Sequence, residues 1–529
     1  MKRPPLAPRL LIAPIVLCAF ARAQRAEAEP PEKAARIATA DSPLGEPAPL
    51  PDGAPAAMAT IVRDDLRRHE FWLADDARHG RFTGSRFQLE TATYIAERFR
   101  DCGLEPLGDR RGYLQEYPLD QVRLDTARLT FGKRTIAEGI AVLPSKEDER
   151  VSIRGRFLYC GSGRPDEVPN GIRGGIPVVV VTKPPVEHKG PAFADFSAMR
   201  RAANAAREFG NEGAAAGVIC LLDGAGPFTN ALNYDALMPD HPRSRFQGRG
   251  GGTPGGRVPV MFLAEKPSRE LLTAMGMQFD SDGNPSRIDP ATRLDGRIEI
   301  SVRHDARGKA WNVAAVLRGS DRKKEAVVFS AHMDHLGTRI DGDAFNGADD
   351  NASGTAALLE IAEAFSKGGK PARSIVFLSF SGEEQGLYGS SWFAQKPTWP
   401  LDQIVANINV DMISRQRREG GAILMLMTPS RNHAAYSTLS RTCEELAAKL
   451  GIALSSGDAY YARSDHYNFA RKNVPVLFLC DGEPPEYHQA NDSADTLDYE
   501  AMEAVARLAF WVGHEIAESK DRPRLLSGR

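Results

Sequence analysis

The sequence predicts an α/β protein with a mixed, largely parallel sheet sandwiched by helices, into which a small β-rich α/β domain is inserted. From about residue 311 onward, runs typical of buried strands alternate with helical patterns, which implies parallel strands covered on both faces. Residues 141–300 differ, with short β-rich runs and glycine-rich turns. The length of 529 residues suggests roughly two to four domains.

An export signal is predicted at the start of the chain. Basic residues precede an apolar run over residues 10–20, and Ala21-Arg22-Ala23 offers a small-x-small cleavage site. We therefore expect residues 1–23 to be a signal peptide that directs the chain out of the cytoplasm, to the periplasm or the medium. No later stretch reaches the roughly 18 apolar residues of a spanning helix, so we expect no membrane span after cleavage.

The folded part is expected to begin near residue 59. Residues 24–58 are rich in Pro, Ala and Glu, which favours a disordered linker over a packed core. Residues 59–140 are expected to form the N-terminal part of the main domain. Within them, residues 87–102 place apolar side chains on one helical face, and Gly103 follows as a stop.

The middle region, residues 141–300, is expected to form an inserted small domain. Its expected strands are residues 176–181, 214–222 and 258–263, and residues 196–210 have a helical pattern. Histidines and carboxylates do not cluster there in a catalytic pattern. We therefore expect the chemistry to lie elsewhere.

Residues 301–520 are expected to contain the catalytic domain. The predicted strands and helices alternate in the manner of βαβ units. The strands are residues 326–330, 374–380, 404–410 and 475–479, and the helices are residues 354–365 and 502–516.

Charge and cysteine content exclude several classes of function. The formal net charge is −2, whereas nucleic-acid binding requires a basic surface. Without the leader, five of the six cysteines remain, scattered and with no C-x-x-C pair. Neither a thiolate zinc site nor a disulfide scaffold is expected.

Histidines and acidic residues stand where the predicted parallel strands end. His332 closes the first strand, Glu383 and Glu384 follow the second, and Asp411 follows the third. The fourth strand leads to the loop that holds His488, and the acidic loop 347–351 precedes a helix. Ligands of open α/β sheets bind at the carboxyl ends of the strands. Each motif alone has an ordinary structural explanation, but five at one sheet edge indicate a functional site.

The motifs HMDHLG, NGADDNASG, SGEEQGLYGS, NVDM and YH resemble those of the M28 family of zinc peptidases, the bacterial leucyl-aminopeptidase type. The segment 80–85 is similar to the family's N-terminal helix entry. The middle region resembles a protease-associated domain, mainly through residues 196–223 and 258–272. This resemblance implies the sandwiched fold of zinc peptidases and phosphorylase/hydrolase-like proteins.

The resemblance also implies a site with two zinc ions. His332 and Asp411 would bind one zinc, Glu384 and His488 the other, and Asp349 would bridge them. The family also implies a cis peptide bond after Asp349. A set of imidazoles and carboxylates without thiolates suits zinc, and cobalt or manganese could also occupy it.

Two further residues would take part in the reaction. By resemblance, Glu383 is the general base, and Asp334 holds the imidazole of His332. Side chains alternate in direction at a strand end, so Glu384 can face a metal while Glu383 faces the substrate. His335 is expected to be structural.

A pocket for the substrate is predicted near the segment 464–466. Asp465 and His466 resemble family residues beside that pocket, although His466 is equally well explained as a structural hydrogen-bond partner. Aromatic residues could line the same pocket or pack in the core: Tyr460, Tyr461 and Tyr487.

The sequence thus predicts an exported di-zinc aminopeptidase that acts on the N-termini of peptides or proteins. Three alternatives stay open: a carboxypeptidase of the same family, a glutaminyl-peptide cyclotransferase and a non-catalytic binding protein. After His488 the chain departs from the family's usual Thr-Pro continuation. Neither the preferred residue nor the oligomeric state is predicted.

Overall fold

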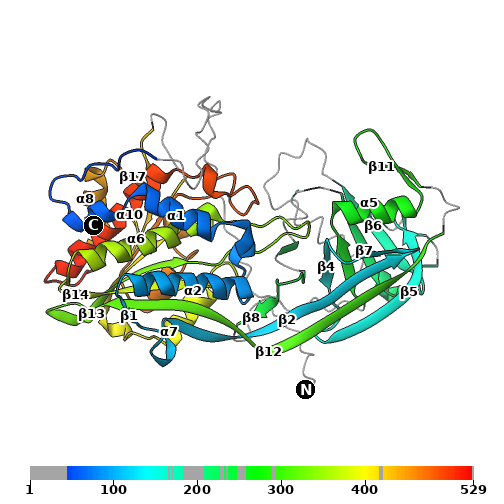
Figure 1. Ribbon diagram of the computed structural model, residues 1–529, viewed down its shortest axis with the longest axis horizontal. Helices are drawn as coiled ribbons and strands as arrows, with labels where there is room; N and C mark the ends of the chain where they lie inside the picture. Colours follow the sequence, from blue (N-terminus) through cyan, green and yellow to red (C-terminus); the bar gives the residue numbers. More distant parts are fainter. Residues whose placement is uncertain are drawn as a thin grey trace, which may run out of the picture. The chain divides into compact units, whose positions relative to one another are not determined.

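A computed structural model describes residues 44–526 (Figure 1). The description has gaps at residues 165–166, 170, 183–207, 223, 225, 227–231, 234–235, 247–257, 289–292 and 416–420. Among the described residues, sixteen strands form one sheet and two more form a hairpin, β10 (Met277–Phe279) and β11 (Pro285–Ile288).

Four neighbouring parallel strands form the centre of the catalytic region. In sheet order they are β18 (Val476–Cys480), β15 (Ile404–Val410), β13 (Arg322–His332) and β14 (Arg373–Phe380). They include all four strands that the sequence predicts after residue 301, and the predicted α/β class is confirmed. On the outer side of β18 lie β16 (Leu424–Thr428), which is antiparallel to it, and β17 (Ala453–Ser456).

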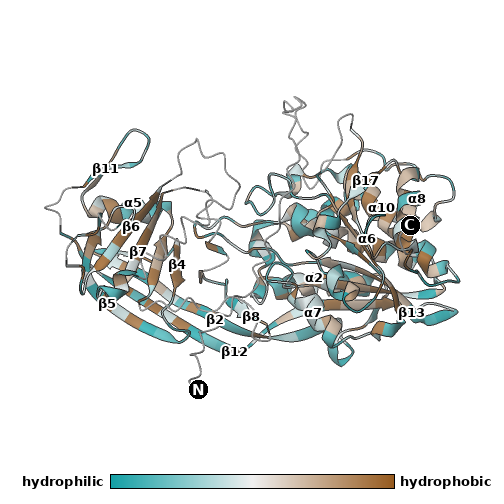
Figure 2. Ribbon diagram, turned by 180° about the vertical axis from the view of Figure 1, so that it is seen from behind, coloured by the Kyte–Doolittle hydropathy of each residue, from teal (hydrophilic) through white to brown (hydrophobic). Residues whose placement is uncertain are grey.

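Helices cover both faces of these strands because their side chains alternate in direction. Val327 and Phe329 of β13 pack in one core with α1 (Arg63–Leu73), α2 (Arg86–Asp101), α6 (Gly354–Lys367), α8 (Thr438–Lys449) and α10 (Tyr499–Glu518). Val328 packs in the other core with α7 (Tyr388–Gln395) and α9 (His466–Ala470). Figure 2 shows the apolar character of β13. No helix among the described residues is both long and apolar enough to cross a membrane.

Two long strands connect the catalytic and inserted regions in one sheet (Figure 1). The strand β12 (Asp295–Leu317) pairs with β14 through Val313–Leu317 and with β5 through Asp295–Val302. Its other edge pairs with β2 (Leu114–Phe131) along most of its length. Short strands complete these edges: β1 (Glu105–Pro106), β3 (Arg134–Ile136) and β8 (Arg243–Arg245).

The inserted region has hydrophobic cores of its own on the two faces of its strands. These strands are β5 (Glu149–Tyr159), β6 (Ile176–Thr182), β7 (Gly217–Leu222), β9 (Val260–Leu263) and β4 (Ile140–Leu143), and α5 (Glu265–Ala274) packs against them. The three predicted strands correspond to β6, β7 and β9. The predicted helix 196–210 lies almost wholly outside the described residues. The domain boundaries and the protease-associated assignment stay predictions.

Candidate metal centre

The carboxyl ends of the parallel strands bring the predicted residues together. β13 ends at His332, the loop after β14 carries Glu383 and Glu384, and Asp411 directly follows β15. The loop after β18 carries His488. Because all four strands run in the same direction, these side chains meet at one edge of the sheet.

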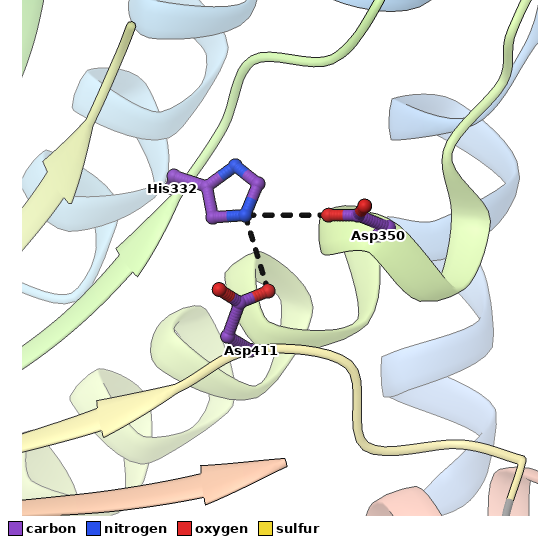
Figure 3. Close-up of side chains that lie close together, drawn as sticks. All are labelled: His332, Asp350 and Asp411. Carbon is purple, nitrogen blue, oxygen red and sulfur yellow. Dashed lines mark hydrogen bonds and ion pairs between the residues drawn. The ribbon is translucent and has the colours of Figure 1, made fainter. Parts of the chain in front are cut away.

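The first group of ligand-type side chains is shown in Figure 3. His332 Nε2 lies 3.1 Å from Asp411 Oδ1 and 3.3 Å from Asp350 Oδ1. All three residues are buried. Asp411 is fixed through its other oxygen, which accepts a hydrogen bond from Ser464 Oγ at 2.7 Å.

A second group lies on the other side of the same aspartate. His488 Nε2 is 3.1 Å from Asp350 Oδ2 and 3.2 Å from Glu384 Oε2. The second glutamate oxygen, Glu384 Oε1, lies 2.7 Å from His335 Nδ1. Asp350 therefore directs one carboxylate oxygen to each group, which is the geometry of a bridging ligand.

The structure corrects the prediction that Asp349 has this bridging position. The carboxylate of Asp349 points away from both groups, and its Oδ1 accepts hydrogen bonds from the backbone N–H (3.0 Å) and the Oγ (2.6 Å) of Ser414. The neighbouring Asp350 faces the histidines instead. The cis peptide bond likewise lies one residue later than predicted, between Asp350 and Asn351.

The two adjacent aspartates have opposite electrostatic surroundings. Burial raises the pKa of Asp349 well above its ordinary value, and the nearby Asp481 and Asp492 raise it further. Burial would also raise the pKa of Asp350, but its contacts with His332 and His488 outweigh this and hold it well below its ordinary value. Asp350 is therefore the carboxylate suited to bind a cation.

Backbone contacts fix the loop that carries this pair. Asp492 accepts hydrogen bonds from the backbone N–H groups of Asp349 and Asp350 at 3.0–3.1 Å, and Arg415 donates to Asp492 at 2.6 Å. Gly347 has a φ of 54°, and a Cβ there would lie 2.2 Å from the Asp350 carbonyl oxygen. Only glycine fits this close approach.

Arg81 ties the same loop to strand β13. Its fully buried guanidinium donates to the carbonyl oxygens of Met333, Leu73, Asn346 and Gly347 at 2.6–2.9 Å. Arg81 lies in the segment 80–85, which the sequence analysis singled out only as a helix entry. The sequence gives no local signal for the role of Arg81, Asp492 or Arg415, because their partners lie far away along the chain.

Asp334 contacts His332 as predicted, and it contacts the loop of Glu383 as well. His332 Nδ1 lies 3.1 Å from the backbone carbonyl oxygen of Asp334, whereas the Asp334 carboxylate is 3.7 Å away. That carboxylate accepts hydrogen bonds from Thr83 Oγ1 at 2.8 Å and from the backbone N–H of Glu383 at 3.3 Å. It thus positions the loop of Glu383, while the backbone of Asp334 orients the histidine.

Glu383 faces a cavity of about 40 Å³ over the first group, which His332, Asp350 and Asp411 also line. Burial raises the pKa of Glu383 well above its ordinary value; Glu384 and Asp411 act in the same direction, and His332 opposes them. A carboxyl whose pKa is raised toward neutrality is suited to exchange protons during a reaction.

The three tentative substrate-binding residues do not line this cavity. Asp465 and His466 are fully buried, and His466 stacks on Phe478 at a ring distance of 4.4 Å. Tyr461 packs against His433 at 4.1 Å. A contact of these three residues with the substrate stays a prediction. Of the predicted aromatic residues, Tyr460 and Tyr487 line the cavity.

The side chains of the centre fit divalent metal ions. Ligand atoms of His332, Asp350 and Asp411 lie within 4.8 Å of one another, and so do those of His335, Asp350 and Glu384. The carboxylates of this centre outnumber its imidazoles once Asp334 and Glu383 are added. Such an excess of buried negative charge is costly unless cations compensate it.

Comparison with known proteins agrees with this geometry. Residues 312–512 match the family model described as Peptidase family M28. A probable leucine aminopeptidase from Arthroderma otae is 27% identical over 234 residues, which cover 42% of this chain and 62% of that protein. A probable zinc metalloprotease from Pyricularia oryzae is 38% identical over 117 residues, which cover 20% of this chain and 23% of that protein.

Among solved structures, a zinc aminopeptidase from Bacillus subtilis is 17% identical, with a TM-score of 0.56, and the alignment covers 87% of this chain and 96% of that one. This likeness shows a common fold. The chain spans only about three fifths of the length (61–62%) of the first leucine aminopeptidases that it matches. The predicted resemblance is confirmed over residues 312–512, which match the model of Peptidase family M28.

Proposed function

We propose that the protein is an exported metallo-aminopeptidase that uses two zinc ions to hydrolyse N-terminal residues from peptides. The observation that carries this proposal is the carboxylate of Asp350, which reaches His332 through one oxygen and His488 through the other. The match of residues 312–512 to the M28 family model supports a peptidase activity, and the names of the relatives support the aminopeptidase type.

Five side chains would hold the two metals. His332 and Asp411 would bind one ion, Glu384 and His488 the other, and Asp350 would bridge them. We prefer His488 to His335 as the second imidazole because it lies close to both carboxylates, whereas His335 Nδ1 is 3.9 Å from Asp350. His335 then positions Glu384. Bound zinc ions would lower the pKa of a shared water and polarise the substrate carbonyl.

The protein's own residues would move the proton. The carboxylate of Glu383 accepts a proton from the attacking water and returns it to the leaving amine nitrogen. The raised pKa of Glu383, which burial causes, supports this role. The Asp334 carboxylate holds the backbone N–H of Glu383, which fixes the base over the cavity.

Metal content and hydrolysis together test the proposal. We expect the purified full chain to contain about two zinc ions and to cleave aminoacyl-anilides, with N-acetylation of the substrate abolishing cleavage. A protein with one zinc ion or none that cleaves no anilide would contradict the proposal.

The Glu383→Gln variant tests the role of the base. We expect it to keep both metals, because its carboxylate is not in the ligand set, and to lose about 10²–10⁴-fold in kcat. Glu445→Gln, an exposed substitution of the same chemistry on α8, is the control. Normal turnover by Glu383→Gln with both metals bound would rule out this mechanism.

The proposal of export rests only on the sequence of residues 1–23, which resembles a signal peptide. Edman sequencing of the protein recovered from the culture medium or the periplasm would give the mature N-terminus. We expect it to follow Ala23.

A further inference from the structure

A second cavity, of about 210 Å³, lies where the inserted region contacts the catalytic region. Catalytic-region residues, including Phe82, Leu336, Glu384 and Gln385, form one part of its wall, and Asn233, His241 and Arg243 of the inserted region form another. Glu384 is a proposed metal ligand. The cavity therefore adjoins the site of the reaction, and its lining shares no residue with the cavity of Glu383.

Two of the three buried polar side chains among the described residues of the inserted region lie at this cavity. Among the described residues between 141 and 300, only three polar or charged side chains are buried: Asn233, His241 and Ser268. Ser268 donates to the carbonyl oxygen of Leu263 at 2.9 Å and needs no further partner. The other two both line the cavity.

Both cavity residues have polar atoms that no described residue satisfies. Asn233 donates through Nδ2 to the carbonyl oxygens of Leu336 and Thr338 at 2.9 and 3.2 Å, which leaves its Oδ1 without a hydrogen-bond partner in the described structure. The two ring nitrogens of His241, a residue 3% exposed, make no well-aligned hydrogen bond, although the backbone groups of Asn233 and Thr338 lie near them. Gln385 adds a third unpartnered acceptor, Oε1. Buried polar atoms of this kind indicate a ligand that completes their hydrogen bonds.

Packing holds these side chains in place. The ring of His241 lies 3.6 Å from that of Phe82, next to Thr83, which bonds the Asp334 carboxylate. Asn233 is anchored to the chain that follows His335. The inserted segment is thus attached to the loops that position the metal centre.

Resting on the proposed function, we infer that this cavity is the subsite for the substrate residue that follows the scissile bond, and that it prefers an uncharged polar side chain. A volume of 210 Å³ is smaller than the roughly 300–1,000 Å³ of typical ligand pockets, so it suits one side chain. Glu384 and Arg243 line it with opposite charges, so neither an acidic nor a basic side chain is favoured overall. The amide of glutamine or asparagine could donate to Asn233 Oδ1 or Gln385 Oε1 and bond the His241 ring.

A peptide series tests this inference. The full-length enzyme is given peptides whose first residue is the one cleaved fastest in the anilide panel, and whose second residue is Gln, Asn, Leu, Asp or Lys. The ratio of kcat/KM for Gln against Leu in the second position is the readout. Each ratio comes from one preparation, so a partly folded variant still gives a valid value.

We expect the wild-type enzyme to prefer Gln and Asn, and we expect His241→Ala and Asn233→Ala each to lower the Gln/Leu ratio about three- to tenfold, the effect of one lost hydrogen bond. The control is His304→Ala, a partly exposed histidine of strand β12 that does not line the cavity. A wild-type enzyme without this preference, unchanged ratios in both variants, or a change confined to the first substrate residue would overturn the inference. Failure of the proposed function is distinguishable, because the wild type would then cleave no anilide at all.

Discussion

The catalytic and inserted regions share one sheet but differ in what they bury. The described part of the inserted region, residues 141–300, buries no Asp, Glu, Lys or Arg side chain. The catalytic region between residues 301 and 520 buries many of them. These are Asp334, Arg339, Asp349, Asp350, Glu360, Arg373, Asp411, Asp465, Asp481, Asp492, Glu503 and Arg507.

This difference separates residues that hold a fold together from residues that build a site. Apolar side chains alone can fill a core, and burial of each adds roughly 1.5–3 kcal/mol of stability. A buried charge lowers stability unless it is paired, as Arg507 is with Glu503. The buried carboxylates of Asp350 and Asp411 belong instead to the candidate metal centre. Asn233 and His241 of the inserted region likewise lie where that region meets the metal centre.

The largest expected effect concerns the two adjacent aspartates. We expect Asp350→Asn to lose its zinc and its activity, because Asp350 is the carboxylate between the two groups of ligands. Asp349→Asn should keep both metals, because the Asp349 carboxylate contacts Ser414 and not the histidines. Its loss of kcat/KM should stay within the roughly 10–100-fold range of residues that support metal ligands.

Metal content and kinetics of the two variants, measured side by side, check this prediction. A metal-free, inactive Asp349→Asn variant together with an active Asp350→Asn variant would show that Asp349, and not Asp350, is the bridging ligand.

A core truncation in the inserted region should affect stability but not chemistry. Leu263 is fully buried in that region's apolar core, so Leu263→Ala should cost about 2–5 kcal/mol of unfolding free energy. Hydrogen exchange should become faster in β6, β7 and β9 and stay unchanged in β13 and β15. At 25 °C the kcat/KM for an aminoacyl-anilide should not change.

The matched control is Leu358→Ala in α6, a fully buried leucine of the catalytic core. It should accelerate exchange in β13 and β15 instead. Equal acceleration of exchange in both regions by either variant would show that the two regions unfold as one unit. Their stabilities could then not be compared separately.

The smallest expected effect concerns a buried carboxyl outside the centre. Both carboxyl oxygens of Glu70 in α1 lack a partner in the described structure. Burial raises its pKa well above the ordinary value, and Arg81 opposes this. The folded state therefore holds this proton more tightly than the unfolded state. The resulting stability is fully present below the unfolded pKa of about 4.3 and is lost as pH rises through the folded pKa.

Glu70→Gln removes this titration. We expect the difference in Tm between the variant and the wild type to grow in favour of the variant as pH increases from 5 to 8. A constant difference across this range would show that Glu70 is ionised in the folded protein. Exchange rates in the inserted region, which buries no described carboxyl group, serve as the internal reference.

The sequence by itself determined the class of fold and the edge of the sheet at which the site lies. Hydrophobic runs identify β13, β14, β15 and β18 because a strand buried on both faces must be apolar along its length. Once these strands are taken as parallel, the residues that follow them must meet at one edge. His332, Glu384, Asp411 and His488 could therefore be assigned to one site from their positions alone.

Only the tertiary structure decided which neighbour in a pair faces the centre. Asp349 and Asp350 are chemically identical and stand in a loop, where no periodicity orients side chains. Their directions depend on the left-handed turn at Gly347 and on hydrogen bonds from a segment 142–143 residues away, at Asp492. The four carbonyl contacts of Arg81 and the cavity of His241 likewise join segments distant in sequence. Such contacts exist only after the chain has folded, which is why no local pattern could reveal them.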